Sequence, residues 1–74
     1  MITTKDITPG FRFKVVDNIY EVLKKYNNYT VDLLNLRHNN IFSYEVQNIV
    51  DHINRGVYHI EPRVVKPLTY IEEL

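Results

Sequence analysis

The sequence predicts an α+β fold that is mostly β, in which a four-stranded antiparallel meander is followed by one short helix and a fifth strand. Apolar and polar residues alternate over much of the first half of the chain, as is typical of half-buried strands. Segments rich in Asp, Asn, Pro or Gly separate these runs at the spacing of tight turns. The apolar period then becomes helical between residues 43 and 56, before a last short β-rich run.

The length and composition indicate one small domain. The chain has 74 residues, no cysteine and a formal net charge of +0, so disulfides and thiolate metal sites are excluded and no global field favours a charged partner. A domain of this size buries a small core, and a partner often supplements its stability. We expect a single β-rich domain over residues 1–62 with an N-terminal arm at 1–8, and a C-terminal tail over 63–74.

The first two strands are predicted to form a hairpin. Pro9 and Gly10 mark a turn that ends the arm, and from residue 11 apolar and basic side chains alternate. Asp17 and Asn18 tolerate positive φ and would form a two-residue turn before a strand over residues 19–26. This register would place Phe13 opposite Val22.

The meander continues through two more strands. Asn27 and Asn28 form the next predicted turn, and residues 29–37 return as a third strand that would place Val22 opposite Leu33. A loop over residues 38–40 then leads to a short strand around Ile41 and Phe42.

The helix is predicted from an apolar stripe at helical spacing. Ser43 would cap its N-terminus, Gly56 would end it, and a fifth strand would follow over residues 57–60. A helix of about 12 residues without alanine is not stable alone, so the stripe must dock on the sheet. The stripe consists of Val46, Ile49, Val50 and Ile53.

This order of four strands, a helical segment and a final strand resembles the layout of SH3-like small barrels over roughly residues 9–61. The resemblance is one of topology, and no motif accompanies it. It implies a sheet that curves into a small barrel. An open meander backed by the helix is the alternative architecture.

One strand face carries enough apolar residues for a core, yet the opposite face is apolar as well. Strand curvature, the arm or tail, or a second protein could cover this second face, since large exposed apolar patches usually mark interfaces. The tail adds apolar anchors beside acidic residues, as short docking peptides do, or it packs on its own domain. The predicted protein interface is Val16, Ile19, Leu23, Leu34, Leu36, Leu68, Tyr70 and Ile71.

Groupings that carry catalysis are not evident. His38, His52 and His59 lack the spacing of a metal pair, and Ser43 is better explained as a helix cap than as a nucleophile. The whole chain contains only two glycines, so no phosphate-binding loop is predicted. We therefore expect a protein that is not an enzyme, with no cofactor and no metal.

A nucleic-acid surface is the second hypothesis, because basic residues near exposed aromatics can follow phosphates while bases stack. The zero net charge and the nearby Glu21 and Asp32 argue against it. The residues concerned are Arg12, Lys14, Lys24, Lys25, Tyr26 and Tyr29.

The sequence thus favours a small non-catalytic protein-binding module that self-associates. Nucleic-acid binding, and a phage inhibitor or small-ligand sponge, are the alternatives. The chain has no long apolar run and no signal layout, so we expect a cytoplasmic protein without membrane partners. The absence of Ala and Trp beside many Asn, Ile, Lys and Tyr indicates an AT-rich gene, as in many bacteria and phages.

Overall fold

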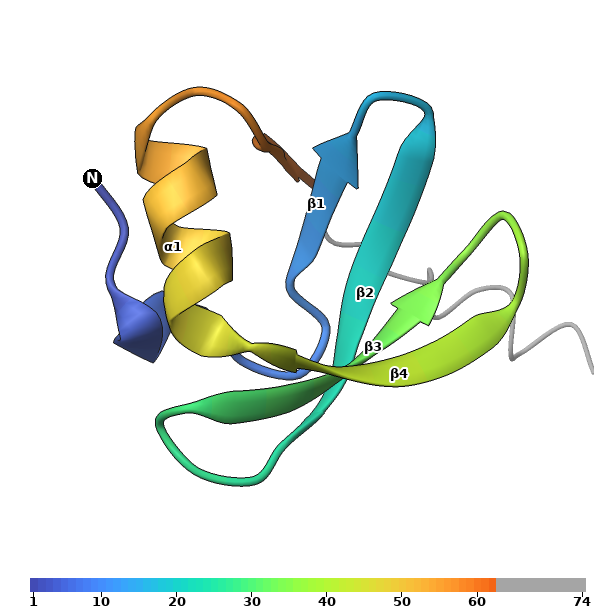
Figure 1. The fold of residues 1–74 in the computed structure, drawn as a ribbon, viewed down its shortest axis with the longest axis horizontal. Coiled ribbons are helices and arrows are strands. Elements are labelled where there is room, and N and C mark those ends of the chain that lie inside the picture. Colours follow the sequence, from blue (N-terminus) through green and yellow to red (C-terminus); the bar gives the residue numbers. More distant parts are fainter. Residues whose placement is uncertain (63–74) are drawn as a thin grey trace, which may run out of the picture.

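The computed structural model describes residues 1–62 and contains one five-stranded antiparallel sheet in the order β4-β3-β2-β1-β5 (Figure 1). A helix and a short 3-10 turn lie together at one end of this twisted sheet. The elements are η1 (Thr4–Asp6), β1 (Arg12–Val15), β2 (Asn18–Lys25), β3 (Thr30–Asn35), β4 (Asn40–Glu45), α1 (Val46–Asn54) and β5 (His59–Glu61). The predicted α+β, mostly β fold is confirmed.

The sheet is open, which decides between the two predicted architectures. Strands β4 and β5 occupy opposite edges and do not pair with each other within residues 1–62. The chain therefore keeps the strand sequence expected from the SH3-like resemblance but forms a helix-backed sheet instead of a closed barrel.

The predicted register of the first hairpin is wrong by two residues. Phe13 lies opposite Tyr20 and Arg12 opposite Glu21, and the turn is formed by Val16 and Asp17. A slip of two residues keeps every side chain on its own face, so the alternating pattern alone does not distinguish the two registers. The observed one stacks the Phe13 and Tyr20 rings and joins Arg12 to Glu21 at 2.6 Å.

The end of β4 also differs from the sequence prediction. Ser43 was expected to cap the helix, but it lies within β4, and its hydroxyl donates to the Asp32 carboxylate at 3.1 Å. The alternation of Phe42 and Tyr44 continues the strand as far as Glu45, which stands at the N-cap position without a side-chain capping bond. The helix is therefore shorter than expected.

The core lies between the sheet and α1. The predicted helical stripe is confirmed, with Val46, Ile49 and Val50 buried and Ile53 partly buried. The stripe packs against the inner face of the sheet, where Val22 and Leu33 pair as predicted. The inner-face members of the core are Phe11, Phe13, Val22, Val31 and Leu33.

The N-terminal segment contributes to this core. Ile7 is fully buried, and η1 contacts α1. The Asn54 side chain at the end of α1 exchanges two hydrogen bonds of 3.0 Å with the backbone of Ile2. Residues 1–7 are thus held against the helix at both of their ends.

Candidate functional site

The face of the sheet opposite α1 carries an apolar cluster at one end. Ile41 lies across from Leu34, and the backbone N–H of Leu36 donates to the Ile19 carbonyl at 2.9 Å. Because side chains alternate along strands, these residues share the face away from the core. Val16 lies in the adjoining β1–β2 turn and is exposed. We call this cluster the outer apolar patch: Val16, Ile19, Leu34, Leu36 and Ile41.

The patch brings together four of the predicted interface residues and adds one. Val16 is 79% exposed and Ile41 is 60% exposed, whereas Ile19, Leu34 and Leu36 are half-buried. Leu23 does not join them, because it lies at a β-bulge of β2 near the other end of the strand. Leu68, Tyr70 and Ile71 lie outside the described residues.

The remainder of this face is polar, and several of its side chains pair with one another. The Arg12 guanidinium bonds to Glu21, and the Tyr26 hydroxyl donates to Asp32 at 2.5 Å. That hydrogen bond, ahead of desolvation and the negative charge of Asp32, raises the pKa of Tyr26. The Lys24 ammonium lies 4.8 Å from the centre of the Tyr26 ring.

The proposed nucleic-acid residues do not form one continuous basic surface. Arg12 is engaged by Glu21, and Lys24 lies opposite Asp32 in the β2–β3 pairing. Lys25 donates instead to the Thr4 carbonyl at 2.7 Å. Acidic side chains thus lie beside Arg12 and Lys24, as in an ordinary solvated face.

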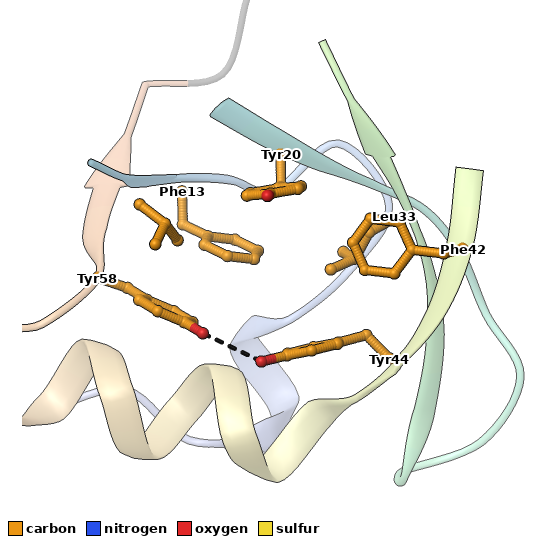
Figure 2. Close-up of a pocket in the computed structure, with 7 residues that line it drawn as sticks. Phe13, Tyr20, Leu33, Phe42, Tyr44 and Tyr58 are labelled. Atoms are coloured by element: carbon orange, nitrogen blue, oxygen red, sulfur yellow. Dashed lines mark hydrogen bonds between the residues drawn. The ribbon is translucent and has the colours of Figure 1, made fainter. Parts of the chain in front are cut away.

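The inner face contains a cavity of about 80 Å³ that the sequence did not predict (Figure 2). Phe13 and Leu33, each 1% exposed, are its most deeply buried walls, while the other aromatic side chains around it are only partly buried. The lining consists of Val15, Leu33 and the aromatic residues Phe13, Tyr20, Phe42, Tyr44 and Tyr58. We call it the aromatic cavity.

The rings around this cavity stand in several orientations. Phe13 stacks with Tyr20 at 5.5 Å and with Tyr58 at 5.3 Å between ring centroids. The Phe42 ring is at 89° to both Tyr20 and Tyr44. Such stacked and edge-to-face pairs are favourable aromatic geometries, so the rings support one another without closing the space between them.

Two tyrosine hydroxyls join opposite walls of the cavity. Figure 2 shows Tyr44 of β4 and Tyr58, which precedes β5, pointing toward each other, with 3.0 Å between their oxygens. The back of Tyr58 stacks on His52 at 4.6 Å, and the His52 Nδ1–H donates to the Asn48 carbonyl at 2.7 Å. Burial, then the hydrogen bond to Tyr44, raises the pKa of Tyr58 to about 12.

The alternating aromatic residues Phe42 and Tyr44 are the part of the cavity lining that the sequence pattern could have indicated, whereas Tyr58 joins them only in the folded structure.

Among residues 1–62, no cluster of His, Asp and Glu is arranged to hold a metal ion. No helix in the same part of the chain is long and apolar enough to cross a membrane. Comparisons with protein-family models, curated proteins and solved structures found no match for this chain.

Proposed function

We propose that this protein is a non-catalytic protein-binding module in which two copies associate through the outer apolar patch. The observation that carries the proposal is the gathering of aliphatic side chains on a sheet face that has no helix over it in the described structure. Apolar side chains gathered on an uncovered sheet face are typical of interaction sites.

The backbone at Val16 supports a role outside folding. Its φ of 56° is in the left-handed region, which β-branched residues rarely adopt, and its side chain is 79% exposed. A valine in this conformation lowers the stability of the fold, and its exposed side chain contributes little stabilisation by burial. Strain of this sort is retained at functional sites more often than elsewhere.

The charges around the patch favour a second copy of the chain as the partner. Lys14 lies opposite Ile19, and Glu21 lies opposite Leu34, so both signs flank the aliphatic side chains. A two-fold interface pairs each patch with itself, which allows Lys14 of one copy to approach the Arg12–Glu21 pair of the other. The net charge of +0 adds no repulsion between copies.

Sedimentation velocity over a range of concentrations tests this proposal. The unmodified chain is expected to form a dimer, and Ile41→Glu is expected to shift it to monomer because the new charge would be buried in the interface. Tyr29→Glu is the matched control, since Tyr29 is 75% exposed and outside the patch. A monomer at every concentration, or a dimer unaffected by Ile41→Glu, would overturn the proposal.

Val16→Asn provides a second variant with opposite effects on folding and association. Asparagine accepts the left-handed conformation more readily, so urea denaturation of the monomer should show a gain on the order of 1 kcal/mol. The same change removes an apolar contact and should weaken the dimer. Weaker association therefore cannot be attributed to loss of folding.

A further inference from the structure

Strand β4 forms one edge of the sheet and lacks the features that usually protect an edge from pairing (Figure 1). All six of its residues pair with β3, and the register does not shift along the strand. The strand contains no proline and no lysine, and its one charged residue is Glu45. Natural edge strands are commonly short, bulged or charged, because a long regular edge is a template for another strand.

The opposite edge of the sheet is different. Strand β5 has three residues, and Pro62, which has no backbone N–H group, follows it directly. Among residues 1–62, β4 pairs with β3 alone, so its other side is open. Of the two edges, β4 is therefore the one suited to accept a further strand.

The hydrogen bonds between β3 and β4 show which backbone groups face this open side. The N–H of Val46 donates to the Tyr29 carbonyl at 2.9 Å, immediately beyond the last pair of the two strands. Bonded and non-bonded positions alternate in an antiparallel ladder, so the even-numbered residues of β4 bond to β3. The N–H and C=O groups of Ile41 and Ser43, together with the N–H of Glu45, therefore point away from the sheet.

We propose that β4 of one copy pairs antiparallel with β4 of a second copy, so that the two sheets become continuous. Two identical strands related by a two-fold axis are self-complementary, because the open N–H and C=O groups of each meet the same groups of the other. With Phe42 and Ser43 near the axis, the two Glu45 carboxylates lie at opposite ends of the pair. No like charges of β4 then face each other.

The side chains of β4 are compatible with this pairing. Phe42 and Tyr44 are half-buried on the inner face, and the aromatic rings of a second copy would lie beside them and cover them further. On the outer face Ile41 is 60% exposed. The Ser43 hydroxyl bonds to Asp32, so it is turned toward β3 and does not occupy the open edge.

This contact goes beyond the proposed function, since it uses the backbone of an edge and not the outer apolar patch. Pairing in the plane of the sheet leaves that patch uncovered. Chains that use both contacts should therefore form assemblies larger than a dimer at high concentration. Ile41→Glu places a charge in both contacts, so other variants are needed to separate them.

Amide hydrogen exchange of the full chain, followed by NMR at low and at high protein concentration, tests the pairing. The amides of Ile41 and Ser43 are expected to exchange on the order of tenfold more slowly at high concentration, because hydrogen-bonded N–H groups are protected. The amides of Phe42 and Tyr44 bond to β3 in both states and are internal controls. Association through the outer apolar patch gives the edge amides no hydrogen-bond partner.

Two variants at one position separate the backbone contact from the side chain. Ser43→Pro removes an N–H that points away from β3, a place where an edge strand accepts proline. Ser43→Ala is the matched control, because it also loses the hydroxyl bond to Asp32 but keeps the N–H. In sedimentation velocity Ser43→Ala should form the same assemblies as the unmodified chain, whereas Ser43→Pro should stop at the dimer.

Val16→Asn weakens the patch contact and should leave the slow exchange of the Ile41 and Ser43 amides unchanged, so the two proposals fail separately. Exchange of these amides that does not depend on concentration would overturn the second copy as the occupant, whether or not another protein pairs with the edge. A folded Ser43→Pro that assembles like Ser43→Ala would overturn it as well. If Ser43→Pro does not fold, the exchange measurement on the unmodified chain decides alone.

Discussion

At the scale of single residues, Tyr58 shows how packing controls an ionisable group. Its ordinary pKa is about 10, and burial together with the Tyr44 hydroxyl raises the pKa to about 12. The folded state therefore holds the proton more tightly than the unfolded state does. The resulting contribution to stability is fully present below about pH 10 and is lost as the pH rises through about 12.

The raised pKa of Tyr58 predicts how the stability of variants changes at alkaline pH. Between about pH 10 and 12 the unmodified chain should lose more stability than Tyr58→Phe, as measured by urea denaturation at a series of pH values. An NMR titration that follows the ring signals of Tyr58 in Tyr44→Phe should show a lower pKa for Tyr58 that still exceeds the ordinary value, because burial remains. Parallel pH profiles for the unmodified chain and Tyr58→Phe would contradict this prediction.

At the scale of elements, the end of α1 depends on the backbone of Gly56. Its φ is +81°, and its N–H donates to the Ile53 carbonyl at 3.0 Å. In the part of the chain that the structure describes, no heavy atom lies within 4 Å of a Cβ built on Gly56, so the cost of adding one is confined to the backbone. The helix ends here because only a residue at ease in the left-handed region can reverse the chain.

Gly56→Ala is therefore expected to lower the free energy of unfolding by about 1–2 kcal/mol, and Gly56→Asn by less. Equilibrium urea denaturation measures both. Arg55→Ala serves as the control, since Arg55 has a φ of −86° that alanine adopts freely. If Gly56→Ala proved as stable as Arg55→Ala, the termination would not depend on positive φ.

The elements also show which parts of the fold the sequence could predict. Alternation and helical spacing identified the strands and the buried stripe, since both patterns depend only on residues that are close in sequence. The start of α1 was misplaced because Ser43 fits a cap and a strand equally well. The β1–β2 register was misplaced because a two-residue slip leaves the pattern intact, and the pairing of Arg12 with Glu21 is settled only in the folded sheet.

The candidate sites divide in the same way. The outer apolar patch follows from alternation, so four of its residues were expected to share a face. The aromatic cavity depends on curvature that brings the Tyr44 and Tyr58 hydroxyls to 3.0 Å across the open sheet. No local pattern encodes that approach, because it results from packing of the segment after α1.

At the scale of the whole molecule, the small core makes the N-terminal segment important. Ile7 is as fully buried as the central residues of the sheet and helix, although its sequence neighbours gave no periodic signal for this. A domain of this size has a thin stability margin, since native proteins are stable by only about 5–15 kcal/mol in general. One additional buried isoleucine is a sizeable share of that margin.

Ile7→Ala is expected to destabilise the fold by about 2–5 kcal/mol, because it removes buried methyl groups and leaves a cavity between η1 and the core. Ile7→Val should cost about 0.5–1.5 kcal/mol, which keeps the effect measurable if the alanine variant does not fold. Met1→Ala is the matched control, since Met1 lies fully exposed in the same segment. Thermal and urea denaturation of the three variants would show whether residues 1–7 belong to the cooperative unit. Equal stability of Ile7→Ala and Met1→Ala would mean that the segment detaches without cost to the sheet.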